Sequence, residues 1–472
     1  MIVLDITIVN IALPSAQRDL GISNADRQWV ITAYTLAFGG LLLLGGRLGD
    51  LYGRKRTFMI GLLGFAAASA LGGSSVSGEM LFASRALQGA FGALLAPSAL
   101  GLLSTTFSSA APKERATAFG IFGGIAGGGS AIGFIAGGLL TEYLSWRWCL
   151  FVNVPIALCA ALGAFRVLHR DHIGKGARIP LDLRGVFLGC GGLLAIVYGT
   201  SEAESRGWSS SLVLACLALG GAMLIAFVFA EKHSDHALLP IHIVADRNRG
   251  GAALSVGLSV VGLFGLFLFL TYYLQVVKGY SPLKTGIAFL PMTVAIVSSS
   301  TGLAARLMNR VPSRNLIVPG LLLAAGGMAW LTQLKVGSSY VSTVLPAEIL
   351  LGVGMGLVFM PSMSLATLGV APRETGAASA TINSAQQVGG SIGTALLNTI
   401  AATATTAYLV GRNASSHLVQ NTASVHGYTV ATTVALAILL VAAVLAFFMV
   451  DHRPAPEEAT GEDTEATVRA AA

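Results

Sequence analysis

The chain has 472 residues, of which 54% are hydrophobic and only 11% are charged, and its mean hydropathy is +0.74. Soluble domains carry about a quarter charged residues, so this composition excludes an ordinary soluble protein and predicts an integral membrane protein. The net charge of +7 would suit a nucleic-acid surface, but the distribution of that charge points elsewhere.

Fourteen apolar segments follow one another along the chain, too long and too uniformly apolar for barrel strands, and they predict an all-α protein. They are 1–14, 27–46, 57–76, 80–103, 116–140, 147–168, 185–201, 210–230, 251–276, 285–306, 315–334, 341–367, 377–408 and 428–450. The first is short for a span, which needs roughly 20 apolar residues. It is either a short or tilted span, or one truncated because the start lies inside it, and we favour truncation.

The loops between these segments predict the orientation in the membrane. If the N-terminus is cytoplasmic, most of the 29 lysines and arginines fall in the even-numbered, inner loops or in the C-terminal tail. This is the positive-inside distribution. We therefore expect a multi-pass protein of a bacterial cytoplasmic (inner) membrane, with a cytoplasmic C-terminus, the lipid bilayer as its surroundings and no nucleic-acid partner.

An internal repeat predicts the domain organisation. Lys113-Glu114-Arg115 and Arg373-Glu374-Thr375 open two spans 260 residues apart, and Gly133 and Gly393 have the same separation. Parallel repeats of this kind are typical of transporters whose substrate site lies between the halves. The predicted domains are an N-terminal six-helix bundle (1–168), a cytoplasmic linker with two inserted transmembrane helices (169–250), a C-terminal six-helix bundle (251–450) and a disordered cytoplasmic tail (451–472).

Two charged residues inside apolar segments are the main candidates for chemistry. Asp5 follows Val3-Leu4 in the first segment, where a charge costs about 2.5–3.5 kcal/mol on insertion scales and burial favours the protonated form. Arg85 lies in the fourth segment and stays ionised, so it demands an acceptor. A fixed cation that approaches or leaves a carboxyl group would make that group release or take up a proton. The alternatives are an interfacial carboxylate and an arginine that extends to the outer surface.

Other residues suggest packing surfaces and a substrate path. Gly129, Gly133 and Gly137, followed by Gly138, leave one face of the fifth span without side chains, which lets another helix approach closely. Glu348 is the one acid well inside a span of the C-terminal half. The predicted substrate cavity contains Gln88, which shares a helix face with Arg85, together with Tyr34, Tyr272 and Glu348.

Several functions lack a sequence signal. The four cysteines fall in predicted spans without metal-ligand spacing, so we expect neither a metal site nor a disulfide. The sequence has no phosphate-binding loop of the Gly-Lys-Ser type and no soluble catalytic constellation. We expect a protein that is not an enzyme, has no cofactor and draws on the proton gradient for energy.

Five motifs together resemble the fourteen-helix drug:proton antiporter family of the major facilitator superfamily. They are Leu4 to Pro14, Gly46 to Arg56, Leu81 to Gly89, Ser145-Trp146-Arg147-Trp148 with Asn153-Val154-Pro155, and Leu274 to Pro282. The resemblance implies a proton-coupling carboxylate at Asp5, with Arg85 as its partner. It also implies a cytoplasmic charge latch at Asp50 and Arg54, and a gating role for the glycine face of the fifth span.

One position departs from the family pattern. Phe134 follows Gly133 where the family usually has proline, which puts the gating role of the fifth span in doubt. With that exception, the resemblance implies a monomeric, multidrug-efflux type of antiporter, associated with antibiotic resistance, that exports amphipathic small molecules by alternating access. The alternatives are a dedicated exporter of one metabolite made by the host cell and a membrane sensor that does not transport.

Overall fold

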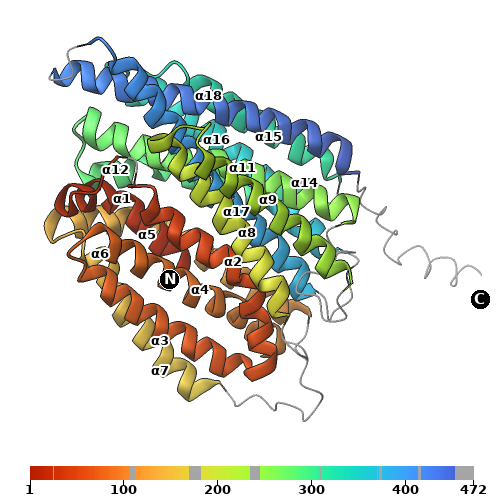
Figure 1. Cartoon of the computed structure of the whole chain (residues 1–472). Helices are drawn as coiled ribbons and strands as arrows, with labels where there is room; N and C mark the ends of the chain where they lie inside the picture. Colours follow the sequence, from red (N-terminus) through yellow and green to blue (C-terminus); the bar gives the residue numbers. More distant parts are fainter. Residues whose placement is uncertain are drawn as a thin grey trace, which may run out of the picture.

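The computed structural model describes the chain except for residues 25, 107–111, 169–181, 234–244, 309, 369, 371–374, 413–415 and 452–472. Inside the helices, the side chains at 43, 50, 104, 105, 112–127, 183, 201, 204, 205, 367, 375–377, 379 and 380 are likewise not described. All regular secondary structure in the described part is helical (Figure 1). The predicted all-α fold class is confirmed.

Each of the fourteen apolar segments corresponds to one helix or to a run of consecutive helical elements. The first half of the chain contains α1 (Ile2–Leu20), α2 (Trp29–Tyr52), α3 (Arg54–Gly73), α4 (Gly78–Thr106), α5 (Pro112–Tyr143), and α6 (Trp148–Phe151) with α7 (Asn153–Val167). Next come α8 (Leu183–Arg206) and α9 (Ser211–Lys232). The last part contains α11 (Arg247–Tyr272) with the π-helix η1 (Tyr273–Val277), α12 (Pro282–Ala288), α13 (Leu290–Ser298), the π-helix η2 (Ser299–Ala304), α14 (Ala305–Leu307), α15 (Arg314–Leu331), the π-helix η3 (Tyr340–Val344) with α16 (Leu345–Thr367), α17 (Thr375–Leu409) and α18 (His417–Met449).

Helices are what a lipid environment allows, because every backbone group must find its hydrogen bond within the segment. Within the described residues, nine helical segments are long and apolar enough to cross a membrane. The first helix is longer than its apolar run of 14 residues, because α1 continues through Pro14 to Leu20. It ends at Gly21, whose φ of 64° is a left-handed conformation that glycine adopts at no steric cost.

The turn between α2 and α3 is one residue long. Gly53 has a φ of 95°, which residues with a Cβ rarely adopt, so the tight turn depends on this glycine. The hydroxyl of Thr57, in the first turn of α3, donates to the Gly53 carbonyl oxygen at 3.0 Å.

The two halves of the chain pack their helices in the same way. In the first half α5 packs against α1, and α4 packs against α2 and α3; in the second half α17 packs against α11, and α16 packs against α13 and α15. Figure 1 shows the two halves as a red-to-orange group and a green-to-blue group. Helix α8 packs against α2 and α17, and α9 packs against α8.

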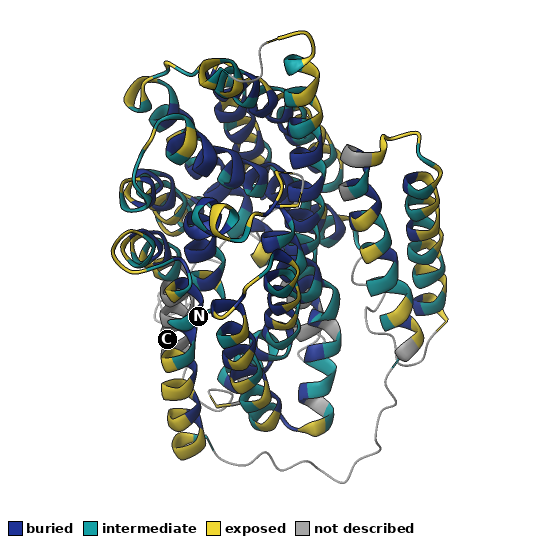
Figure 2. Cartoon of the chain, turned by 60° about the vertical axis from the view of Figure 1, so that its left-hand side comes forward, coloured by how far each residue is buried: buried dark blue, intermediate teal, exposed yellow. Residues whose placement is uncertain are grey.

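The buried residues lie where the helices face one another. Figure 2 shows them in dark blue along the central helices, with exposed residues on the outside of the molecule. Large apolar side chains such as Ile60, Phe165 and Phe229 are exposed, as lipid-facing residues are expected to be. Polar side chains in the interior therefore stand out, and they are the starting point for the functional site.

Candidate functional site

The Asp5 carboxylate is the centre of a buried polar cluster. The Arg85 guanidinium donates from Nη1 to Asp5 Oδ2 at 2.5 Å. The other carboxylate oxygen, Oδ1, accepts from Asn153 Nδ2 at 2.7 Å and from Gln88 Nε2 at 3.1 Å. Asp5 has no solvent-exposed surface and Arg85 only 1%, so both charges are withdrawn from solvent and from lipid.

Arg85 and Gln88 also form further hydrogen bonds. Arg85 donates from Nε to the Val30 carbonyl oxygen at 2.9 Å and from Nη1 to Gln88 Oε1 at 2.7 Å. Gln88 donates to the Ser69 hydroxyl, and the Arg85 guanidinium lies 4.4 Å from the centroid of the Tyr34 ring. The Tyr34 hydroxyl, by contrast, has no hydrogen-bond partner among the residues that the structure describes.

Five helices supply the residues of this cluster. The residues come from α1 (Asp5), α2 (Val30 and Tyr34), α3 (Ser69), α4 (Arg85 and Gln88) and α7 (Asn153). Gln88 is three residues after Arg85, so both side chains lie on one face of α4 and reach the same carboxylate. A buried ion pair of this kind compensates its loss of hydration only when further hydrogen bonds complete it, and here they do.

The structure brings together Asp5, Arg85, Gln88 and Tyr34, as sequence patterns led us to consider. Asn153 and Ser69 are additions. Asn153 was visible only as part of the motif Asn153-Val154-Pro155, and no sequence signal singled out Ser69. The fully buried position of Asp5 and Arg85 argues against the two alternatives, an interfacial carboxylate and a surface arginine.

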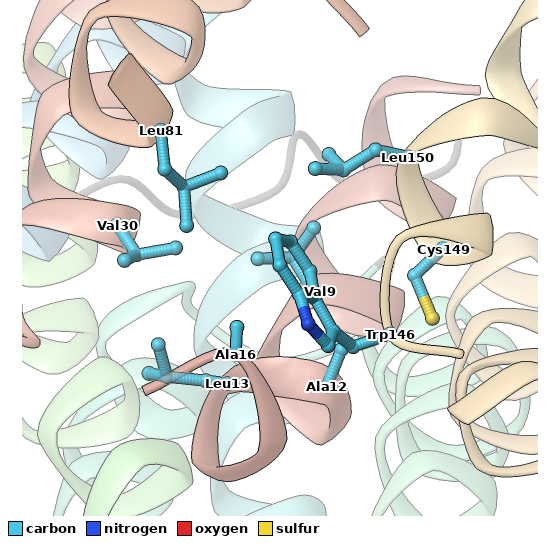
Figure 3. Close-up of a pocket in the computed structure, with 9 residues that line it drawn as sticks. All are labelled: Val9, Ala12, Leu13, Ala16, Val30, Leu81, Trp146, Cys149 and Leu150. Carbon is cyan, nitrogen blue, oxygen red and sulfur yellow. The ribbon is translucent and has the colours of Figure 1, made fainter. Parts of the chain in front are cut away.

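An apolar pocket lies near this cluster, towards the end of α1 that we expect to face outward. The pocket is lined by residues of α1, α2, α4 and α6 and by Trp146, which lies just before α6. The lining residues are Val9, Ala12, Leu13, Ala16, Val30, Leu81, Trp146, Cys149 and Leu150. Figure 3 shows their side chains around a common space, with the Trp146 indole beside Val9. None of the four residues predicted for the substrate cavity lines it.

The glycine face of α5 packs directly against the helix that carries Asp5. A Cβ on Gly133 would lie 1.9 Å from the Thr7 hydroxyl oxygen, and one on Gly137 would lie 2.9 Å from the Ile8 carbonyl oxygen. Gly138 instead faces α12, where its Cβ would lie 2.5 Å from the Cα atom of Leu283. Gly129 has more room, since its nearest neighbours are 3.9 Å away. The glycine face thus brings α5 close both to α1 and to the second half of the molecule.

Phe134 adds an aromatic contact between the halves. Its side chain is buried and stacks on Phe289, with ring centroids 5.0 Å apart. Phe267 completes the group, at 5.6 Å from Phe134 and 5.5 Å from Phe289. The residue that departs from the family pattern therefore fills the space between α5, α11 and the α12–α13 junction.

Polar contacts between the halves gather at the expected outer end. Asn10 donates to Thr271 Oγ1 at 3.2 Å, and Gln275 donates to the Ile11 carbonyl oxygen at 2.9 Å. Glu142 accepts from the Leu283 backbone nitrogen at 3.0 Å. Together with the Phe134 group, these contacts hold α1 and α5 against α11 and α12 at this end.

Tyr272 belongs to the same outer contacts. Its hydroxyl donates to Gln17, and the Arg27 guanidinium lies 4.0 Å from the centroid of its ring. Arg27 also donates to Asn398 Oδ1 at 3.1 Å. Tyr272 is 4% exposed and lies between the two halves, while Glu348 is fully buried within the second half. The four residues predicted for one cavity thus occupy three separate places.

Only one member of the predicted latch can be placed. Arg54 donates from Nη1 to the Gly101 carbonyl oxygen of α4 at 2.9 Å, which ties the start of α3 to its own half. The Asp50 side chain lies outside the described residues, and so do the side chains of Lys113 to Arg115. The latch stays a prediction.

No group of His, Cys, Asp and Glu that could hold a metal ion occurs among the residues that the structure places. All four cysteines are free, and Cys190 donates its thiol hydrogen to the Gly40 carbonyl oxygen at 2.9 Å, where α8 meets α2.

A buried acid and base in one half of a twofold-repeated helical bundle are typical of secondary transporters, and comparison with known proteins gives the family. The family model described as Major Facilitator Superfamily matches residues 1–394. The chain belongs to the major facilitator superfamily. It is therefore a multi-pass membrane transporter and not an enzyme.

Similar sequences carry names that refer to antibiotics. The chain is 55% identical over 463 residues to the puromycin resistance protein pur8 of Streptomyces alboniger, covering 98% of this chain and 91% of that protein. It is 37% identical to the cephamycin export protein CmcT of Amycolatopsis lactamdurans (86% and 83% covered). It is 35% identical to the tetracenomycin C resistance and export protein of Streptomyces glaucescens (85% and 74% covered).

Solved structures confirm the major facilitator fold. The POT family transporter PepTSo aligns with a TM-score of 0.64 at 14% identity, covering 96% of this chain and 98% of that one. A bacterial homologue of the human lysosomal transporter Spinster, in an inward-facing and unoccupied conformation, aligns with a TM-score of 0.63 at 14% identity, covering 95% of each chain. At such low identity these likenesses concern the fold alone.

Proposed function

We propose that this transporter exports amphipathic, antibiotic-like small molecules in exchange for protons, by alternating access. It works as a monomer in a bacterial cytoplasmic membrane, with the C-terminal tail in the cytoplasm. The energy comes from the proton gradient, and the partners are the substrate, protons and the surrounding lipid.

The observation that carries the proposal is the buried cluster around Asp5. With Arg85 at 2.5 Å, the carboxylate is stabilised in its ionised form. If the helices rearrange so that Arg85 withdraws, the carboxyl group loses its cation in a buried place and binds a proton instead. Asp5 lies on α1 and Arg85 on α4, so a movement between these two helices would separate or rejoin the pair.

The contacts between the halves support the second part of the proposal, alternating access. They hold the expected outer end of α1 and α5 against α11 and α12, which corresponds to a state closed to the outside. The α5–α12 contact, where Gly138 and Phe134 meet Leu283 and Gly286, is one that must separate when the outer side opens.

The names of the relatives guide the choice of substrates. The relative at 55% identity makes puromycin the first compound to test. A second candidate function is export of a single compound made by the host cell, because several relatives are named after one antibiotic each. A panel of cationic, neutral and anionic amphipathic compounds separates broad from dedicated export.

Proton-driven efflux in inverted membrane vesicles tests the coupling role of Asp5. We expect Asp5→Asn to abolish uptake driven by a pH gradient, because an amide cannot carry the proton. The matched control is Asp26→Asn, which makes the same change at an exposed loop carboxylate. Full transport by Asp5→Asn would remove Asp5 from the mechanism, and no pH-driven transport by the unmodified protein would favour the sensor alternative.

A further inference from the structure

Glu348 is a buried acid that the cluster around Asp5 does not include. It lies in the first turn of α16 and has no exposed surface. Its Oε2 atom is 3.1 Å from the Tyr340 hydroxyl oxygen, and its Oε1 atom has no hydrogen-bond partner in the described part of the chain. No ion pair joins Glu348 to a cation among the described residues.

The hydrogen bonds of Tyr340 determine where the protons are. The Tyr340 hydroxyl oxygen is 2.7 Å from the Ala288 carbonyl oxygen, which can only accept. A tyrosine hydroxyl has a single hydrogen, so the shorter bond to Ala288 uses it. The contact between Tyr340 and Glu348 then needs a hydrogen from the Glu348 side, which a carboxylic acid has and a carboxylate lacks. The geometry fits a protonated Glu348.

The surroundings of Glu348 offer no charge that would favour the carboxylate. The helices α13 and η2 contain no titratable residue, while α11, α15 and α17 carry theirs near their ends. These are Arg247, Arg249, Tyr272, Arg314 and Tyr408. None of them forms a hydrogen bond or ion pair with Glu348 in the part of the chain that is described, where Tyr340 of η3 is the titratable partner.

In the internal repeat, Glu348 corresponds to Gln88, which belongs to the Asp5 cluster. Gln88 and Glu348 are 260 residues apart, the separation of Gly133 from Gly393. Gln88 lies on the fourth helix of its half and Glu348 on the fourth helix of the other half. The carbonyl oxygens used nearby also correspond, since Arg85 donates to Val30 on the second helix and Tyr340 donates to Ala288 on its counterpart.

From this geometry we infer that Glu348 is a second proton-binding site of the transporter, in the C-terminal half, and that its proton is bound in the conformation described here. The proton occupancy of Glu348 is independent of the proposed function. Its part in transport rests on that function.

The position of Ala288 connects this site to the contact between the halves. Ala288 ends α12, the helix that packs against Phe134 and Gly138 of α5. A movement of α12 would remove the acceptor of the Tyr340 hydrogen and so change the hydrogen bonding of Glu348. Exchange for an exported substrate requires that the Glu348 proton enter from the outside and leave to the inside.

Infrared spectroscopy of the protein purified in a detergent without ester groups tests the occupancy directly. A protonated carboxylic acid has a C=O stretch that carboxylates lack. We expect this band at neutral pH, and we expect Glu348→Gln to remove it. Glu79→Gln, at an exposed carboxylate, is the matched control and leaves the band unchanged. A spectrum unaltered by Glu348→Gln would overturn the inference.

A second variant keeps the test valid if Glu348→Gln does not fold. Tyr340→Phe removes the acceptor of the Glu348 hydrogen but not the acid, so we expect the band to shift in frequency. An unshifted band would mean that Glu348 does not donate to Tyr340, which contradicts the argument above.

Coupling measurements test the role in transport. In vesicles, the substrate gradient sustained by a fixed pH gradient reports the number of protons exchanged per substrate. We expect Glu348→Gln to lower that gradient by the factor that one proton contributes, while transport continues. An unchanged gradient would exclude Glu348 from the exchange. Without proton-driven transport by the unmodified protein, the proposed function fails, yet the infrared band still tests the occupancy.

Discussion

The two halves of this transporter hold their buried acids in opposite ways. In the N-terminal half, Asp5 has a cation at 2.5 Å and two amide donors, so its hydrogen-bonding partners suit a carboxylate. In the C-terminal half, Glu348 has one hydroxyl neighbour and an oxygen without a partner, which suits a neutral acid. Two bundles with the same helix packing can therefore keep one acid charged and the other neutral, because a single arginine decides the charge.

Removal of that arginine should have the largest effect. Arg85→Ala leaves Asp5 buried without its cation, and breaking a buried pair in this way costs about 3–5 kcal/mol. We expect a large drop in the thermal unfolding temperature in detergent. The double variant Asp5→Asn with Arg85→Gln should recover much of the loss, since no isolated charge remains. Equal instability of the single and double variants would mean that the pair is not what stabilises this half.

The next largest effect should come from Asn153. Asn153→Ala removes a hydrogen bond to a charged acceptor, and such bonds contribute about 1.5–3 kcal/mol. We expect lower thermal stability, because the carboxylate of Asp5 loses a donor. In a protein that already carries Asp5→Asn, the same Asn153→Ala substitution should have a smaller effect on stability. A double-variant cycle measures this difference. An undiminished effect would show that Asn153 acts independently of Asp5.

The glycine contacts test whether the halves are equivalent in packing. A Cβ on Gly133 would lie 1.9 Å from a side-chain oxygen on α1, and a Cβ on Gly393 would lie 2.5 Å from the Cα atom of Val261 on α11. We expect Gly133→Ala and Gly393→Ala each to destabilise the protein by about 1–3 kcal/mol, the usual cost of overpacking. Gly128→Ala, where nothing lies within 4 Å, is the control. A large difference in thermal stability between the two alanine variants would show that the two halves are not equivalent in packing.

Tyr340→Phe should have the smallest effect on stability. The bonds it removes join uncharged groups, and such bonds contribute about 0.5–1.5 kcal/mol. The comparison with Asn153→Ala is the point of interest, because both variants delete one hydrogen-bonding group next to a buried acid. We expect the Asn153 variant to be the less stable by thermal unfolding. The reverse order would indicate that Glu348 is the charged acid of the two.

The sequence singled out the central residues of the Asp5 site but not all of its members. Asp5 and Arg85 were recognisable because charges inside apolar segments are costly, and Gln88 because it is three residues from Arg85. Asn153 and Ser69 were not, since they lie 148 residues from Asp5 and 19 from Gln88 in the chain. Their distance to the carboxylate depends on how α3 and α7 pack against α1 and α4.

Phe134 and the predicted cavity show the same limit. Loss of the family proline raised doubt about the gating role of α5, but only the structure shows that the phenylalanine stacks on Phe289 of the other half. Likewise, Tyr34, Gln88, Tyr272 and Glu348 are polar or aromatic residues in apolar segments, a pattern that does not tell which helix each one faces. The structure separates them into the Asp5 cluster, the outer contact and the second half.

The sequence by itself determined the helices, the order of the two halves and the two charged residues inside apolar segments, Asp5 and Arg85. It could do so because lipid forces each segment to satisfy its backbone hydrogen bonds locally, which leaves a signal in every span. The tertiary structure decided which side chains meet, which acid has a cation and where the halves touch. Those contacts join residues far apart in the chain, and glycine positions such as Gly133 and Gly138 set how closely their helices approach.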